Sequence, residues 1–245
     1  MISAVILAKN EEKNLPGCLE SIRQLANEIV VINDDSTDKT IEIAKKFGAK
    51  VFTHSLNNDF AQQHNFGLGK AKGDWVLFID ADERVTPDLK KEIISAVKKQ
   101  NKAGFYLKRQ EFFNGKPLKY GETVHYLLRL GRKGKGRWQR EVHEVWQIKG
   151  EIGRLKNPLL HYSHPTLSEF IEHINRFSTL HAQLLFKEGV KPSLWRIIAN
   201  PLAKFMQNYL FRLGFLDGTL GIIVALMMSF HSFLARAKLY FLWKK

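Results

Sequence analysis

Short runs of apolar, often β-branched residues alternate with amphipathic stretches along the first hundred residues. The apolar runs predict buried strands at Ser3–Ala8, Glu28–Ile32, Lys50–Thr53 and Trp75–Ile79. The stretches between and after them predict helices at Glu12–Leu25, Thr37–Phe47, Phe60–Ala71 and Pro87–Lys99, the last capped by Thr86. Continuous apolar strands separated by helices indicate an α/β fold with a mostly parallel sheet covered on both faces.

The pattern changes after Lys99 into short strand-like segments that are rich in cations and aromatic residues. Thirteen Lys or Arg stand against two Glu between Lys98 and Arg140. We expect a mixed section here, with short strands at Phe105–Lys108 and Tyr126–Leu130. Two interpretations of this basic block remain open, a solvated cationic face and a surface that meets phosphorylated lipid headgroups.

The C-terminal eighty residues read as helical and become strongly apolar. A capping box at Thr166–Glu169 opens one helix, and helical spacing resumes from about Leu194. Gly218–Ala235 contains no charged residue over 18 positions, which is the lower limit for crossing a bilayer. A packing helix, a helix in the membrane interface and a true span all fit this segment. The flanking basic residues favour the interfacial interpretation.

The composition narrows the class of partner. The 245-residue chain carries a net charge of +14, which predicts an anionic partner. No zinc finger, RNA-recognition signature or basic heptad repeat occurs, so we expect no nucleic acid beyond a nucleotide. The single cysteine, Cys18, excludes a disulfide framework. Glu11 and Glu12 come too early for a signal peptide, so we expect the chain in the cytosol.

Polar clusters follow the predicted strands at their carboxyl ends, where parallel sheets bind ligands. The sharpest is Asp80-Ala81-Asp82-Glu83, because two carboxylates leaving a buried strand can hold Mg²⁺ or Mn²⁺ together with substrate phosphates. The acidic run that begins at Asn33-Asp34 can accept hydrogen bonds from a base or ribose. Alternatively, it only caps the next helix and complements the dipole of that helix. Asn10–Glu12, after the first strand, has the same two interpretations.

Together these motifs resemble the family-2 glycosyltransferases of the GT-A fold. The matching pieces occur in the family's order and spacing and are Asn10–Glu12, Asp34–Thr40, Phe60–Asn65 and Gly73–Glu83. Later segments are similar to the subgroup that adds glucose to the lipopolysaccharide inner core, namely Arg137–Glu144, His161–His164 and Gly214–Gly221. The resemblance implies a Rossmann-like GT-A sheet with a C-terminal helical extension. It places a catalytic domain at 1–165, divided near residue 100 into nucleotide-sugar and acceptor halves, before a membrane-associating region at 166–245.

The resemblance also implies roles for individual residues. Asp82 with Asp80 would hold Mg²⁺ or Mn²⁺ on the donor diphosphate, and His161 is a candidate third metal ligand or a diphosphate contact. Glu144 would be the general base of an inverting displacement, with His143 as the alternative base. The nucleotide-sugar pocket would be lined by Asn10, Glu12, Asp34, Asp80 and Ala81.

Two positions depart from the family pattern. Asn33 stands where an acidic residue is usual, which leaves Asp34 as the contact for the base or ribose. His64 stands where Arg or Lys is common, which weakens the case for a phosphate contact at that position.

The expected function is therefore metal-dependent, inverting transfer of glucose from UDP-glucose to a lipopolysaccharide inner-core heptose. The acceptor would be a phosphorylated glycolipid, and the enzyme would be cytoplasmic and peripheral on the inner face of the cell membrane. Two alternatives stay open. One is transfer to a polyprenyl phosphate or to a protein or peptide. The other is a noncatalytic membrane-binding protein on a degenerate transferase fold.

Overall fold

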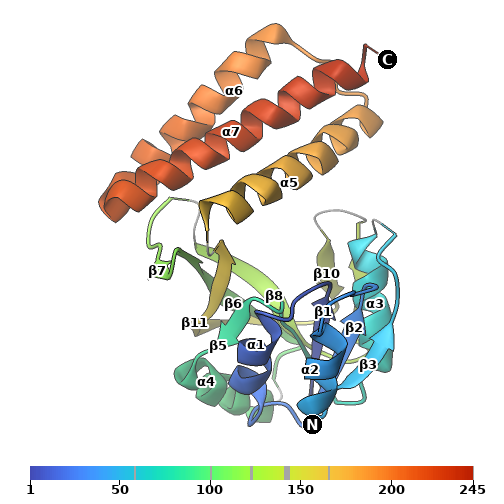
Figure 1. Ribbon diagram of the computed structural model, residues 1–245. Helices are drawn as coiled ribbons and strands as arrows, with labels where there is room; N and C mark the ends of the chain where they lie inside the picture. Colours follow the sequence, from blue (N-terminus) through green and yellow to red (C-terminus); the bar gives the residue numbers. More distant parts are fainter. Residues whose placement is uncertain (58, 100, 122–123, 141–143, 165, 245) are drawn as a thin grey trace. The chain divides into compact units, whose positions relative to one another are not determined.

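The computed structural model describes residues 1–57, 59–99, 101–121, 124–140, 144–164 and 166–244 (Figure 1). They form two compact units. Unit 1 comprises Met1–Arg109 and His125–His161, and unit 2 comprises Gln110–Val124 and Tyr162–Lys245. The segment Gln110–Val124, which the sequence groups with the catalytic domain, therefore packs with the C-terminal helices.

Unit 1 is built on the parallel strands that the apolar runs predict. In spatial order they are β3 (Lys50–Thr53), β2 (Glu28–Asn33), β1 (Ile2–Ala8) and β4 (Trp75–Phe78). Each strand ends within one residue of its predicted limits. The helices are α1 (Leu15–Ile22), α2 (Thr40–Lys46), α3 (Phe60–Lys70) and α4 (Pro87–Lys99). Thr86 caps α4 as predicted, its hydroxyl accepting the Leu89 N–H at 3.1 Å.

The sheet continues beyond β4 with antiparallel pairings, so it is mixed and mostly parallel in its N-terminal half, as expected. The further strands, in order, are β8 (Val124–Arg132), β6 (Gly104–Phe113), β11 (Ile152–His164) and β5 (Glu83–Val85), with β7 (Lys116–Pro117) beside β6. β8 runs antiparallel to β4, and β5 antiparallel to β11. β9 (Gly136–Gln139) and β10 (Val145–Ile148) form a separate hairpin. Strands β6 and β8 are both longer than the sequence indicates.

Apolar side chains fill both faces of this sheet. Those of α1 and α4 cover one face, and α3 covers the other. Helix α3 lies so close to β1 that a Cβ at Gly67 would stand 2.6 Å from Val5 Cγ1, so only glycine fits there. Trp138 and Trp146 of the β9–β10 hairpin stack at 5.4 Å and meet Phe78 edge-on, which closes the core below the hairpin.

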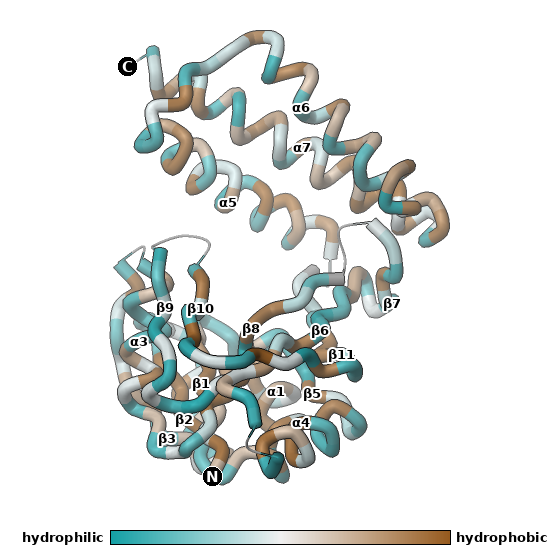
Figure 2. Tube along the Cα trace, turned by 180° about the vertical axis from the view of Figure 1, so that it is seen from behind, coloured by the Kyte–Doolittle hydropathy of each residue, from teal (hydrophilic) through white to brown (hydrophobic). Residues whose placement is uncertain are grey.

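Unit 2 is dominated by three helices. They are α5 (Leu167–Lys187), α6 (Leu194–Met206) and α7 (Gly218–Leu242), with a π-helical turn η1 (Gln207–Phe211) and a 3₁₀ turn η2 (Gly214–Asp217) before α7. Thr166 is the N-cap of α5, as the predicted capping box requires, since its hydroxyl accepts the Glu169 N–H at 3.2 Å. Helix α7 lies between α5 and α6 in a single layer (Figures 1 and 2).

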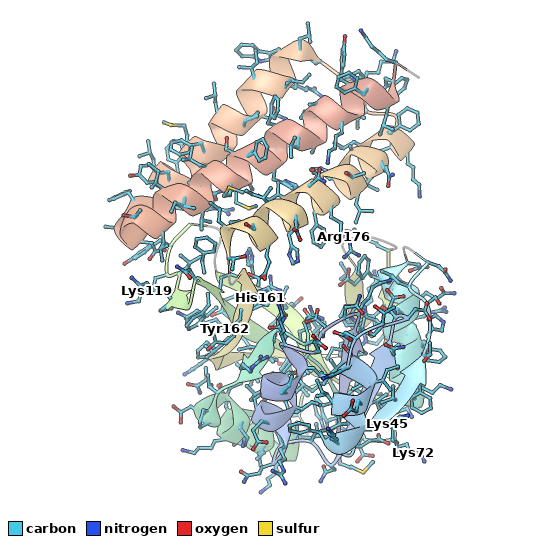
Figure 3. All side chains as sticks on the ribbon, in the orientation of Figure 1. Lys45, Lys72, Lys119, His161, Tyr162 and Arg176 are labelled. Atoms are coloured by element: carbon cyan, nitrogen blue, oxygen red, sulfur yellow. The ribbon has the colours of Figure 1, made fainter. Side chains whose placement is uncertain are left out.

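The glycine-rich turn before α7 has a structural explanation. A side-chain carbon at Gly221 would collide with the Gly214 carbonyl, and Gly218 adopts a φ of 61°. The Asp217 carboxylate accepts the backbone N–H groups of Lys119 and Tyr120 at 3.0 and 2.9 Å (Lys119 is labelled in Figure 3). This turn therefore ties the start of α7 to the 110–124 segment of the same unit.

Candidate active site

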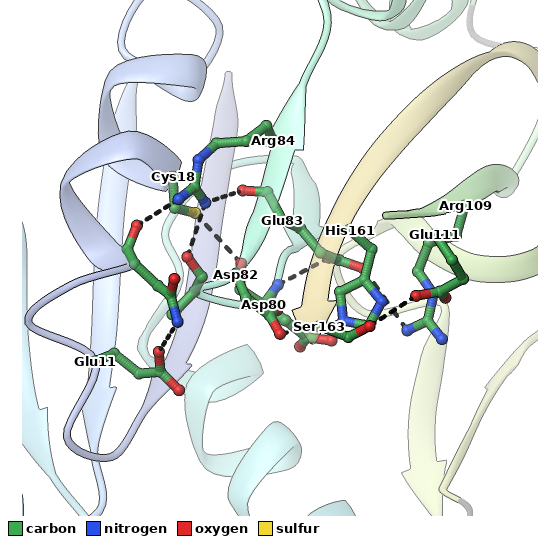
Figure 4. Close-up of polar contacts among 12 residues, drawn as sticks. Glu11, Cys18, Asp80, Asp82, Glu83, Arg84, Arg109, Glu111, His161 and Ser163 are labelled. Carbon is green, nitrogen blue, oxygen red and sulfur yellow. Dashed lines mark hydrogen bonds and ion pairs between the residues drawn. The ribbon is translucent and has the colours of Figure 1, made fainter. Parts of the chain in front are cut away.

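The turn Asp80–Asp82 leaves β4 at its carboxyl end and is held from several sides (Figure 4). The Glu83 carboxylate accepts the Asp80 N–H at 2.9 Å, and the Cys18 thiol donates to the Asp80 carbonyl at 3.4 Å. Arg84 donates to the Ala81 carbonyl at 2.9 Å and to the Asn14 carbonyl at 2.7 Å. These bonds fix the backbone of the turn, while the Asp80 and Asp82 side chains remain 35% and 21% exposed.

Arg129 is the residue of this site that sequence reasoning missed. Its Nη2 lies 2.9 Å from Asp80 Oδ2, and its side chain is only 9% exposed. Burial alone would lower the pKa of Arg129, but Asp80, Glu83, Glu144 and Asp82 together raise it. One buried cation therefore faces four carboxylates, and the guanidinium stays charged at any physiological pH.

The two neighbouring acids respond in opposite directions. Burial opposes ionisation of Asp80, but Arg129, Arg109 and His161 outweigh it and lower the pKa of that carboxyl. Burial, followed by the charge on Asp80, raises the pKa of Glu83. A proton in this cluster therefore resides on Glu83, and Asp80 is the ionised member.

Asp82 and His161 face each other across the site. His161 Nε2 lies 3.2 Å from Asp82 Oδ2, and His161 belongs to β11 (Figures 3 and 4). Adjacent ligands of an octahedral Mg²⁺ with bonds of about 2.0–2.1 Å are about 3 Å apart, so this pair fits two positions of such an ion. Asp80, the other expected ligand, lies against Arg129 instead.

Within the described ranges, no three His, Cys, Asp or Glu side chains converge to form a complete metal site. Mg²⁺ commonly takes one or two protein ligands and completes its shell with substrate phosphates and water. The Asp82–His161 pair therefore suits a cation that arrives with a diphosphate.

The two candidate bases lie just before β10. His143 falls outside the described residues. Glu144 is described and partly buried, and it is one of the carboxylates that raise the pKa of Arg129. The structure thus brings Glu144 within electrostatic reach of the Asp80–Arg129 pair, although the two segments are more than sixty positions apart in sequence.

Asn10 and Glu12 connect the loops that follow β1 and β2. Asn10 adopts a φ of 56°, and its Oδ1 accepts the Thr37 N–H at 2.8 Å. Glu12 accepts the Lys39 N–H at 3.2 Å and donates its own N–H to Asp38 at 3.0 Å. These bonds hold Asn10–Glu12 in a loop, which explains why α1 begins at Leu15 and not at Glu12.

Asp34 is nearly buried and already has two partners. It accepts the Leu56 N–H at 2.8 Å and pairs with Lys9 Nζ at 3.0 Å. Asn33, the departure from the family pattern, accepts the Ser36 N–H at 3.1 Å and so shapes the same loop. Because Oδ1 of Asp34 is bonded to Leu56, a ligand would contact Asp34 through Oδ2, the oxygen that pairs with the exposed Lys9.

Glu11 belongs to the acidic cluster, although nothing in the local sequence pattern favours it over Glu12. Burial raises the pKa of Glu11 to about 6, a hydrogen bond from Asn14 opposes the shift, and Asp82, Asp80 and Asp38 add to it. The position after β1 that faces the aspartate turn is thus Glu11.

His64 is a core residue. Its Nδ1 donates to the Phe60 carbonyl at 2.8 Å, and its ring lies 4.1 Å from that of Trp138. Burial first, and the charge of Arg129 second, lower the pKa of His64 to about 4. The imidazole is therefore neutral in the folded protein at physiological pH.

This burial predicts a pH dependence of stability. Because the pKa falls from 6.5 when unfolded to about 4 when folded, the unfolded chain takes up the proton first as the pH drops. The stabilisation is complete above pH 6.5 and is lost toward pH 4. As the pH falls from about 7 to about 5, uptake of the proton by His64 in the unfolded chain should reduce the free energy of unfolding by about 2 kcal/mol, measured by urea denaturation. His64→Gln should lack this component, and the exposed His173→Gln should retain it. An unchanged pH slope in His64→Gln would contradict the assignment.

Known proteins resemble this chain over most of its length. The sequence pattern described as Glycosyl transferase family 2 matches residues 3–149. The chain is 32% identical to the lipopolysaccharide core biosynthesis glycosyltransferase LpsC of Rhizobium meliloti, covering 98% of this chain and 92% of LpsC. It is 27% identical to an uncharacterized glycosyltransferase of Rickettsia bellii, covering 97% and 85% of the two chains. The crystal structure of S. aureus TarS 1–349 in complex with UDP has a similar fold, with a TM-score of 0.52 at 15% identity over 99% of this chain and 91% of TarS 1–349.

Proposed function

This chain belongs to glycosyl transferase family 2, and on that premise we propose that it transfers glucose from UDP-glucose to a lipopolysaccharide inner-core heptose with inversion. The observation that carries the proposal is the cluster at the end of β4. There an ionised aspartate, a buried arginine and the Asp82–His161 pair meet within reach of Glu144. The likeness to LpsC supports the choice of acceptor, and the resemblance to the glucose-adding subgroup implies the donor.

Each part of the cluster has a task in sugar transfer. A divalent cation held by Asp82 and His161 would act as a Lewis acid on the donor diphosphate. Glu144 accepts the proton of the acceptor hydroxyl while the hydroxyl oxygen bonds to the anomeric carbon of the donor sugar. The bond between that carbon and the donor diphosphate breaks at the same time. The electron pair leaves with UDP. Arg129 keeps Asp80 ionised and holds the turn in place.

The acceptor would be a phosphorylated glycolipid, so the enzyme would work at the inner face of the cytoplasmic membrane. The net charge of +14 suits such an anionic substrate and surface. Transfer to a polyprenyl phosphate, protein or peptide would need the same donor site, so an acceptor assay must separate these cases.

A donor panel with the purified protein tests the proposal. We expect UDP-glucose to raise the melting temperature by about 5 °C or more at a hundredfold excess over its dissociation constant, and only with Mn²⁺ or Mg²⁺ present. EDTA should abolish transfer, and activity undiminished in EDTA would remove the metal. A larger shift with another nucleotide-sugar would replace the donor. The absence of any shift would favour the noncatalytic alternative.

A further inference from the structure

Exposed apolar side chains are concentrated on unit 2. Among the described residues, all but three of the exposed large apolar side chains lie there, the exceptions being Met1, Tyr126 and Val145. Helix α6 carries the most exposed stripe. Leu194, Ile198, Leu202 and Met206 recur every four residues and therefore share one face. Trp195 beside them is 75% exposed, and no α6 residue is buried. A face this large and apolar marks an interaction site.

The charges around the stripe are almost all positive. Residues 189–245 contain eight Lys or Arg and one acid, Asp217, whose carboxylate already binds two backbone N–H groups. Arg196 on α6 and Arg236 on α7 form no ion pair within the described part of the chain. Burial, and then the charge of Arg196, lower the pKa of Arg236, so these two cations lie near each other. An anionic headgroup would neutralise such a pair.

The helical segment Gly214–Leu242, which contains α7, is long and apolar enough to cross a membrane, and an 18-residue window within it has a mean hydropathy of 1.7. Two polar side chains of α7 are nevertheless bonded to its neighbours. Lys238 Nζ donates to the Asn175 carbonyl, Ser178 Oγ and Thr179 Oγ1 of α5, at 2.7–2.8 Å. Ser229 Oγ donates to the Pro201 carbonyl of α6 at 2.8 Å. Crossing a bilayer would break these bonds or drag α5, with Glu169, Glu172 and Arg176, into lipid.

We propose that unit 2 docks in the plane of an anionic phospholipid bilayer through the α6 stripe, and that α7 does not cross it. The membrane element is then Leu194–Met206 and not the Gly218–Ala235 segment to which hydropathy alone points. Only the purpose of docking rests on the proposed function, since a glycolipid acceptor resides in such a membrane. The docking itself depends on the apolar stripe of α6 and on the positive charge of residues 189–245.

Vesicle co-sedimentation tests this docking with the full-length protein. The probes are phosphatidylcholine vesicles with and without about one-third phosphatidylglycerol. We expect the anionic vesicles to retain at least about tenfold more protein, with high salt weakening the binding. The double variant Ile198→Glu/Leu202→Glu should lose at least about tenfold of the affinity. The matched control Gln24→Glu/Asn101→Glu, which adds the same two negative charges at exposed polar positions of unit 1, should lose less than about twofold.

Other outcomes would overturn the inference in identifiable ways. Equal binding of both vesicle types, or of both variants, would exclude docking through the stripe. Retention after an alkaline carbonate wash would show that α7 spans. If the protein forms a dimer in the absence of vesicles, and Ile198→Glu/Leu202→Glu makes it monomeric, a second copy of the chain covers the stripe. The UDP-induced melting shift should be unchanged in the α6 variant, so failure of docking is separable from failure of the donor site.

Discussion

Asp82→Asn should lower the rate of sugar transfer about a thousandfold, equivalent to about 4 kcal/mol of transition-state stabilisation. The substitution keeps the shape of the side chain but removes the anionic oxygen that lies 3.2 Å from His161 Nε2. A neutral amide binds a divalent cation weakly, so the charge on the departing diphosphate would lose its counterion. Steady-state rates across a Mn²⁺ titration measure the effect.

The control for this variant is Asp88→Asn, which changes an exposed carboxylate on α4 that pairs with Lys91 at 3.5 Å. Its rate should match that of the unaltered enzyme. The melting shift with UDP and Mn²⁺ gives a second readout, which Asp82→Asn should lose. Retention of both the shift and the rate in Asp82→Asn would remove the aspartate from the site.

Glu144→Gln should reduce turnover about 10²- to 10⁴-fold, since a glutamine cannot accept the proton of the acceptor hydroxyl. The amide fills the same space, and Glu83 and Arg84 hold the backbone of the turn at Asp80. Donor binding should therefore stay within about twofold of the original, so the loss appears in kcat and not in the affinity for UDP.

Glu151→Gln is the matched control, because Glu151 is an exposed carboxylate of unit 1 that pairs with Lys102 away from the turn. Single-turnover rates with saturating donor separate the chemical step from product release. A fully active Glu144→Gln enzyme would exclude this residue as the base and direct attention to His143.

The strands that place the site were predictable because their sequence pattern is local. β1, β2 and β4 are apolar runs followed by polar residues, and their burial on both faces requires a continuous apolar pattern, while the edge strand β3 is only partly buried. The lengths of β6 and β8 in the second half of the sheet were underestimated, because the prediction follows local apolar runs and these are interrupted there. Lys108 and Arg109 interrupt the apolar run of β6, yet the strand continues to Phe113.

Arg129 shows what a linear pattern cannot reveal. It stands in a block of thirteen cations, where an arginine is usually solvated, and nothing in its neighbours marks it as buried. Its role depends on β8 pairing with β4 across fifty residues, which brings it to Asp80. The aspartate turn was identified because both carboxylates come from one short segment, whereas their partners come from distant strands.

The only thiol of the chain lies inside the core, bonded to the Asp80 carbonyl and with its pKa raised by burial. A buried, protonated thiol reacts slowly with alkylating reagents. A cysteine introduced at Ile198 would then carry a spin label or fluorophore with almost no background. The depth at which α6 rests in a lipid film becomes measurable without first removing Cys18.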